Sequence, residues 1–112
     1  MSIKTIKFPV KGFIKQGDTV PSYRITFSND YTGDFTTATI KMQVYNGNTR
    51  IIDISNGNGM TVLSSNSLEI DEIQNNDFPH GTFIGDFEVT EADGERTTYF
   101  NVQYTIIKQY TV

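Results

Sequence analysis

The acidic residues that lie closest together in the chain are the first candidates for chemistry. Glu69, Asp71, Glu72 and Asp77 fall between positions 69 and 77, and carboxylate oxygens are ligands that a calcium ion prefers. However, the sequence has no D-x-D-x-D-G loop, and Glu69 and Asp71 fall on the solvent side of the strand expected around residues 67–70. The pattern therefore favours a solvated acidic face over a metal site, and we expect no metal or other cofactor.

A catalytic site is the second possibility, and the single histidine would be its natural general acid or base. His80 stands between Pro79 and Gly81, where a loop enters a strand, and this position is typical of a surface histidine. The sequence contains no cysteine, no serine in a G-x-S-x-G elbow and no glycine-rich run like a phosphate-binding loop. We therefore expect a protein without enzymatic activity.

Positive charge gathers at the start of the chain, on Lys4, Lys7, Lys11 and Lys15. The whole chain has 9 basic and 13 acidic residues and a net charge of −4, which argues against nucleic acid as the main partner. Two interpretations of residues 1–15 stay open. They form either a basic arm that docks on the acidic face of a neighbour, building a homo-oligomer or ring, or an edge strand of their own domain.

Aromatic residues at outward positions indicate a competing function. Tyr31, Tyr45, Tyr99 and Tyr110 are candidates for an open face on which a sugar ring of a host glycan stacks. No tryptophan, the usual stacking residue of such platforms, is present, and half-buried tyrosines are ordinary strand residues. A small carbohydrate-binding β-sandwich is therefore the alternative to a protein that acts through protein–protein contacts.

The elements that must position these residues are strands, and the clearest lie between positions 81 and 107. Residues 82–90 and 97–106 both alternate between apolar and polar side chains, the pattern of a strand with one buried face. Asp93 and Gly94 stand between them, and glycine accepts the positive φ that a tight reversal needs. We expect a long hairpin here on which the other strands assemble.

Further strands are expected around residues 3–10, 23–27, 39–45, 49–54, 60–63 and 67–70. Asn46 and Gly47 join two of them, since Asn-Gly is the strongest two-residue hairpin signal. The pattern predicts an all-β single domain over residues 1–112, an antiparallel immunoglobulin-like β-sandwich of about seven to eight short strands, with a small closed barrel as the alternative. The expected core comprises Phe27, Ile40, Met42, Val44, Ile52, Phe83, Phe87, Val89, Phe100 and Val102.

Loops at the ends of a sandwich often carry function, because the sheets hold them in place. The turns at Asn46-Gly47 and Asp93-Gly94 are therefore candidate interaction sites. No apolar run approaches the roughly 18 residues of a membrane-spanning helix, and the first residues do not resemble a signal peptide. We expect synthesis in a cytoplasm and no insertion into a membrane.

Three pieces of the sequence resemble one known family. The hairpin opens with glycine and an aromatic residue, alternates acidic and apolar side chains, turns at Asp-Gly and returns through a strand rich in Thr and Tyr. Residues 35–44 contain a T-x-A step that leads into I-x-M-x-V, and residues 59–62 and 67–70 give a third match. From about Gly17 to Ile107, these pieces resemble a small β-sandwich domain of tailed-phage virion proteins. That domain is best known at the N-terminus of upper baseplate and tail-fibre-like proteins.

The resemblance implies a function and a location. Related domains dock onto a core and present a receptor-binding part, so the implied function is that of a non-catalytic structural or adaptor protein at the tail, baseplate or fibre attachment. The implied partners are other virion proteins. The implied location is the virion, assembled in the cytoplasm of the bacterial host.

Overall fold

The computed structural model describes residues 4–10, 12–74 and 76–108, and these residues form nine strands and no helix. The long strands follow the alternation of apolar and polar side chains that predicted them. The strands are β1 (Lys4–Phe8), β2 (Ile14–Lys15), β3 (Tyr23–Thr26), β4 (Thr39–Asn46), β5 (Thr49–Asn56), β6 (Gly59–Ser64), β7 (Ser67–Ile70), β8 (Gly81–Thr90) and β9 (Arg96–Ile107).

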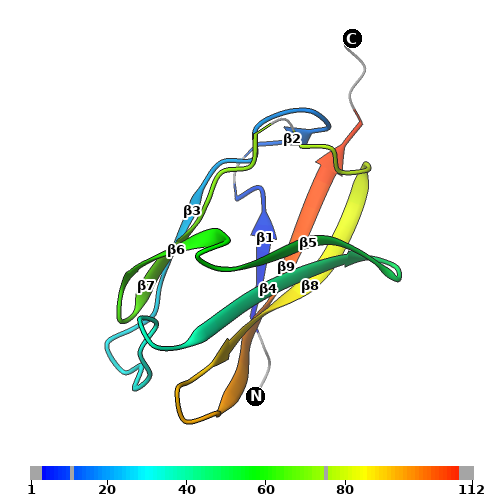
Figure 1. Ribbon diagram of the computed structural model, residues 1–112. Helices are drawn as coiled ribbons and strands as arrows, with labels where there is room; N and C mark the ends of the chain where they lie inside the picture. The colour runs from blue at the N-terminus through cyan, green and yellow to red at the C-terminus, as the bar shows by residue number, and fades with distance from the viewer. Residues whose placement is uncertain (1–3, 11, 75, 109–112) are drawn as a thin grey trace.

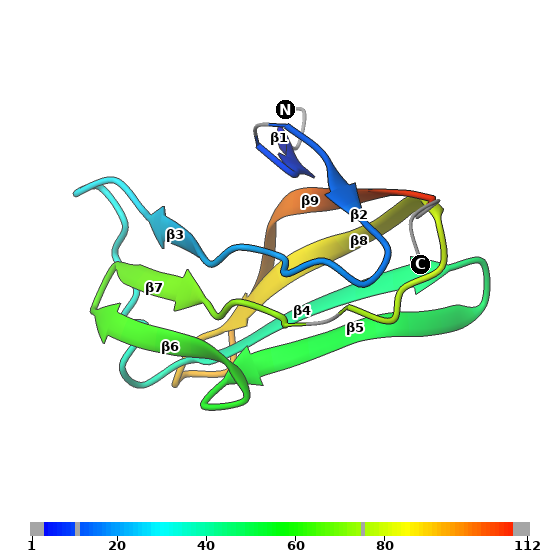
Figure 2. The same ribbon diagram turned by 90° about the horizontal axis from the view of Figure 1, so that it is seen from above.

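The nine strands form one curled sheet (Figures 1 and 2). Their order is β1-β9-β8-β4-β5-β6-β7-β3, and β2 also pairs with β9. Seen from above in Figure 2, the sheet bends round into a half-barrel, so that its two terminal strands, β1 and β3, lie on either side of the open part. We call this open part, bounded by β1 and β3, the seam.

The all-β class is confirmed, whereas the antiparallel immunoglobulin-like sandwich is not. β1 and β2 both run parallel to β9, and β5 runs parallel to the start of β6. The second parallel pairing depends on Gly57 and Gly59, whose φ angles of 85° and 90° let the chain loop back within a few residues. The sheet is therefore mixed, and it encloses its core by curling.

The predicted hairpin forms the second and third strands in the sheet order, next to the edge strand β1. β8 and β9 pair from end to end, and Gly94 turns the chain between them with a φ of 93°. The rings of Phe87 and Phe100 stack with centroids 4.5 Å apart and planes 11° apart. Gly85 lies so close to β4 that an added Cβ would overlap the carbonyl oxygen of Gln43, so this position requires glycine.

The core lies inside the curled sheet. Nine of the ten residues predicted to face inward are buried, and Phe27 is partly buried against them. A second buried group, which the prediction did not include, comes from β1–β3, β6, β7, the end of β9 and the loops: Phe8, Ile14, Val20, Ile25, Phe35, Ala38, Met60, Leu68, Ile70, Phe78, Tyr104 and Ile106.

Residues 4–8 belong to the sheet of their own chain. β1 pairs with β9 from Lys4 opposite Phe100 to Phe8 opposite Tyr104, so of the two interpretations of this segment the structure shows the edge strand. Phe8 stacks on Tyr104 with centroids 4.6 Å apart and meets Tyr23 of β3 edge-to-face at 5.1 Å. The ring of Phe8 therefore joins the two terminal strands across the seam.

Asn76 holds two loops together. Its side-chain amide donates to the carbonyl oxygens of Lys15 at 2.9 Å and Asp18 at 2.7 Å, and its backbone N–H donates to Asp18 as well. Val20 and Ile73 pair as an isolated bridge between the same two loops. These contacts fix the segment that enters β3 against the segment that leads to β8.

Candidate interaction surfaces

An apolar cavity opens at the seam. Its volume is about 330 Å³, and its walls come from the segment between β1 and β2 on one side and the segment entering β3 on the other. Apart from Ser22, every lining residue is apolar or aromatic. The lining residues are Phe8, Pro9, Val10, Ile14, Val20, Pro21, Ser22 and Tyr23.

Two large apolar side chains in the segment between β1 and β2 are exposed to solvent. Val10, which lines the cavity, has 59% of its surface exposed, and Phe13, the residue before Ile14, has 81% exposed. Side chains with this exposure add little to the core. Val10 therefore adds exposed apolar surface at the cavity, and Phe13 adds more in the same segment. Exposed apolar surface of this kind often marks protein contacts.

Three of the four predicted basic residues lie in the strands that precede and follow the segment with Val10 and Phe13. Lys4 and Lys7 of β1 and Lys15 of β2 are exposed, and Lys11 lies outside the described residues. Because β1 is paired within its own chain, Lys4 and Lys7 are presented on a fixed edge strand.

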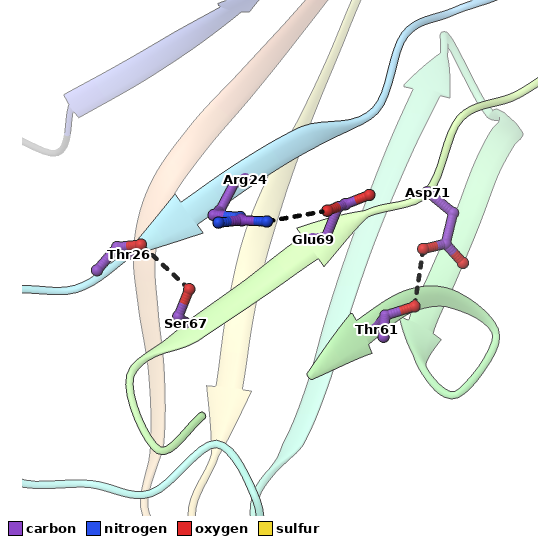
Figure 3. A network of polar contacts seen from close by, with 6 residues as sticks. All are labelled: Arg24, Thr26, Thr61, Ser67, Glu69 and Asp71. Atoms are coloured by element: carbon purple, nitrogen blue, oxygen red, sulfur yellow. Dashed lines mark hydrogen bonds and ion pairs between the residues drawn. The ribbon is translucent and has the colours of Figure 1, made fainter. Parts of the chain in front are cut away.

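Two of the predicted acidic residues contact side chains of neighbouring strands (Figure 3). The Glu69 carboxylate lies 3.7 Å from the guanidinium of Arg24 on β3, and Asp71 accepts a hydrogen bond from the Thr61 hydroxyl at 2.9 Å. The first contact joins β3 to β7, and the second joins β6 to the residue that follows β7. Glu69 and Asp71 therefore help to hold the β3-β7-β6 part of the sheet, and their charges are partly satisfied there.

The loop between β7 and β8 carries the other predicted polar candidates. Glu72, Asp77 and His80 are all exposed there. Nowhere in the described residues are three or more His, Asp or Glu side chains grouped so that they could hold a metal ion. Glu72 and Asp77 are the exposed members of the predicted acidic patch, and the Glu72 carboxylate accepts a hydrogen bond from the Gln74 side-chain amide at 3.0 Å.

The two predicted turn sites lie at opposite ends of the sheet. The Asn46-Gly47 turn follows β4, and the Asp93-Gly94 turn follows β8. β4 and β8 pair in antiparallel fashion, so the end of each lies beside the start of the other (Figure 1). The structure therefore does not bring the two turns together into one surface.

A cluster of aromatic rings, which the sequence did not reveal, joins the segment after β3 to β9. The ring of Phe27 lies 5.0 Å from Tyr31, 4.9 Å from Phe35 and 4.8 Å from Tyr99, measured between centroids. Tyr31 and Tyr99 are 6.0 Å apart, with their planes at 86°. The cluster continues the contact across the seam beyond the Phe8–Tyr23 pair, because Phe27 follows β3 directly.

The position of Tyr31 is fixed by a carboxylate. Its hydroxyl donates to Oε2 of Glu91 at 2.5 Å, and Oε1 of the same group accepts the backbone N–H of Asp34 at 3.2 Å. Burial, followed by the hydrogen bond to Glu91 and its negative charge, raises the pKa of Tyr31 well above the ordinary value of 10.0. The hydroxyl therefore keeps its proton and remains a donor over the whole physiological range.

Tyr99, whose surface is 36% exposed, lines two depressions. The first, which we call the aromatic groove, has a volume of about 440 Å³ and is lined by Thr26, Phe27, Ser28, Asp30, Tyr31, Tyr99 and Phe100. The second, the acidic pocket, has a volume of about 330 Å³ and is lined by Thr32, Gly33, Asp34, Thr37, Glu91, Ala92, Asp93, Glu95 and Tyr99.

The structure thus brings together two of the four tyrosines predicted for a sugar-binding face. Tyr31 and Tyr99 both line the aromatic groove. Tyr45 lies near the end of β4, away from this groove in the sheet order, and Tyr110 lies outside the described residues. The single outward face expected for all four is therefore not formed.

No protein-family model, curated protein or solved structure matches the chain. The described residues form no helix, and hence none that is long and apolar enough to cross a membrane. What this chain does must therefore be inferred from its own motifs and surfaces.

Proposed function

We propose that this chain is a non-catalytic structural or adaptor protein of a tailed-phage virion, at the tail, the baseplate or the attachment of a fibre. The motifs between Gly17 and Ile107 supply this context through their resemblance to virion domains. The observation that carries the proposal is the seam. Here the sheet ends in β1 and β3 beside an apolar cavity, with Val10 and Phe13 exposed.

The partner is an extended segment of a neighbouring virion protein. A terminal strand has backbone N–H and C=O groups along its outer side, and an incoming strand can pair with them. An apolar side chain of that segment would enter the cavity, which Phe8 and Tyr23 help to line. Backbone pairing would set the direction of the segment, and burial of apolar surface, at about 25 cal/mol per Å², would supply most of the favourable free energy.

The charge beside the seam selects an acidic segment. Lys4 and Lys7 are exposed on β1, and their contacts with a partner carboxylate would weaken as the Debye length falls to about 3 Å at 1 M salt. A second copy of this chain offers Glu72 and Asp77 to the same lysines. Light scattering tests whether the chain pairs with itself in this way. An oligomer that forms at low salt and is lost at 1 M salt supports a homo-oligomer or ring, whereas a monomer at both salt concentrations rules out this pairing.

The immunoglobulin-like sandwich remains part of the proposal. Phe27, directly after β3, lies 6.2 Å from Phe87 of β8 between ring centroids. Opposite walls of the curled sheet therefore face each other across one core, as the two layers of a sandwich do. This arrangement supports the resemblance to virion β-sandwich domains without requiring two separate sheets.

Quantitative mass spectrometry of purified particles tests the proposed function. The protein is expected in the particle peak of a density gradient, at a constant ratio to other tail proteins across the fractions. An abundant host cytoplasmic protein serves as the marker of carry-over. Abundance in the lysate of infected cells without enrichment in particles over that marker would contradict the proposal.

A further inference from the structure

The aromatic groove has the composition of a ligand site rather than of a core. Four aromatic residues, Phe27, Tyr31, Tyr99 and Phe100, line it together with the polar residues Thr26, Ser28 and Asp30. Binding sites for small polar molecules typically combine apolar or aromatic walls with a few polar groups that fix the orientation of the ligand. Asp30 is exposed and sits in the turn closed by the Tyr31 N–H and the Ser28 carbonyl oxygen, which are 3.0 Å apart.

The rings of the groove are held in place before any ligand binds. Tyr99 packs against Phe27, with centroids 4.8 Å apart, and Tyr31 is anchored by its hydrogen bond to Glu91. Ordering of the rings therefore costs little on binding, and such preorganisation favours affinity. The centroids are close enough that the rings fill the space between themselves. A ligand must consequently lie on their exposed side, where Tyr99 offers the most accessible surface among them.

We propose that this groove binds a neutral saccharide, of the kind that a glycan on a host surface presents. The apolar C–H face of a pyranose ring would stack on the exposed part of Tyr99, because an aromatic face attracts weakly positive C–H groups. The Asp30 carboxylate would accept hydrogen bonds from sugar hydroxyls, and these charge-assisted bonds are stronger than those between neutral groups. Ser28 is a further polar residue of the groove wall, and the Thr26 hydroxyl beside it shares a hydrogen bond with the Ser67 hydroxyl at 3.1 Å.

The charges around Tyr99 explain why the saccharide should be neutral. The acidic pocket on its other side contains Asp34, Glu91, Asp93 and Glu95, and Asp30 adds a fifth carboxylate in the groove. An anionic sugar such as a uronate would approach several like charges and be repelled. The same turn residue that the sequence singled out, Asp93, thus contributes to selectivity.

The groove is distinct from the cavity at the seam. The cavity is lined by residues 8–10, 14 and 20–23, whereas the groove is lined by residues 26–28, 30–31 and 99–100. No residue lines both. An adaptor that holds a virion partner at the cavity would therefore leave the groove free to contact a glycan.

Titration by nuclear magnetic resonance tests this proposal. The ¹⁵N-labelled protein is titrated separately with maltohexaose, cellohexaose, chitohexaose and an oligogalacturonate, and backbone shifts are followed. We expect at least one neutral oligosaccharide to shift the signals of residues 26–31 and 99–100, and the oligogalacturonate to leave them unchanged. Tyr99→Ala should weaken that binding about tenfold or more, whereas Tyr99→Phe should retain most of it.

The chain offers a matched control. Tyr45 is 39% exposed, close to the 36% of Tyr99, so Tyr45→Ala should leave the affinity unchanged. Asp30→Asn removes a charge at an exposed position, so it should weaken binding without shifting the thermal unfolding midpoint. This second variant keeps the test decisive even if Tyr99→Ala unfolds.

Several outcomes would overturn the proposal. One is the absence of shifts in the groove with every neutral oligosaccharide at millimolar concentration. Another is equal affinity for the oligogalacturonate, and a third is full affinity in both Tyr99→Ala and Asp30→Asn. Shifts caused by tetramethylammonium but by no saccharide would also overturn it, and would assign the rings to cation binding instead.

Discussion

Replacement of Phe8 by alanine probes the packing of the first strand. The Phe8 ring is buried, stacks on Tyr104 at 4.6 Å and meets Tyr23 at 5.1 Å. Truncation of a buried phenylalanine costs about 3–5 kcal/mol, and each lost ring pair accounts for about 0.5–1.5 kcal/mol of this beyond its buried area. Because a domain of this size is stable by about 5–15 kcal/mol, Phe8→Ala should remove a large share of the free energy of unfolding.

Urea unfolding followed by far-ultraviolet circular dichroism measures this loss. Phe13→Ala is the matched control, since it makes the same substitution in the same segment at a side chain that is 81% exposed. We expect the control to change the free energy of unfolding by no more than about 0.5 kcal/mol. The midpoint of Phe8→Ala should fall while the slope of the transition stays the same.

Two results would refute this account of the first strand. One is a loss below about 1 kcal/mol for Phe8→Ala, and the other is an equal loss for Phe8→Ala and Phe13→Ala. Either would mean that residues 4–8 do not pack on their own chain and are free to act on a neighbour. Deletion of residues 2–11 gives an independent test, because a deletion variant as stable as the full chain would lead to the same conclusion.

Three further predictions concern the core and the alkaline limit of stability. Phe87→Ala and Phe100→Ala should each cost about 3–5 kcal/mol, because both rings are buried and stacked; chemical melts that give less than about 1 kcal/mol for both would show that the inward faces are wrong. Gly85→Ala should lower the thermal midpoint, because its Cβ would overlap the Gln43 carbonyl oxygen, and an unchanged midpoint would speak against this close approach. Burial raises the pKa of Tyr104 above the ordinary value of 10.0, so the folded state keeps a proton that the unfolded chain loses. That contribution to stability is present below pH 10 and is lost as the pH rises toward the folded-state pKa. Tyr104→Phe should therefore lose less stability between about pH 9 and pH 11 than the unchanged protein, and equal losses would contradict the assigned shift.

The local part of the fold could be predicted from the sequence. The β8–β9 hairpin and the β4–β5 hairpin each combine two alternating runs with a turn that contains glycine, Gly94 or Gly47. Such signals lie within a few residues of each other, and they also fix which side chains face inward. For the same reason the predicted core proved buried at every position except Phe27, which is partly buried.

The closure of the sheet could not be predicted in this way. Parallel pairing of β1 with β9 joins the two ends of the chain, and no turn signal marks such a pair. The number and spacing of the predicted strands favour an antiparallel sandwich, but they do not specify how the terminal strands meet. The terminal strands are brought together by the packing of Phe8 between Tyr104 and Tyr23, which are far from each other in the sequence.

The candidate sites were only partly visible in the sequence for similar reasons. Tyr31 and Tyr99 were identified as residue types, but the carboxylate that fixes Tyr31 belongs to Glu91 in a distant turn. The acidic residues near position 70 suggested one patch, whereas pairing of β7 with β3 engages Glu69 with Arg24. Side chains that are neighbours in sequence can thus contact different strands, and side chains that are distant in sequence can lie in one site.

Site-directed cross-linking in assembled particles tests most directly whether the seam is an attachment surface. The chain has no cysteine, so Val10→Cys directs a maleimide–benzophenone reagent to the seam. Ile84→Cys on β8 is the control, because Ile84 is 62% exposed and Val10 is 59% exposed. We predict that, on illumination of purified particles, position 10 cross-links to another virion protein and position 84 does not. Cross-links from position 84 alone, or none from position 10 in particles that contain the protein, would contradict attachment through the seam.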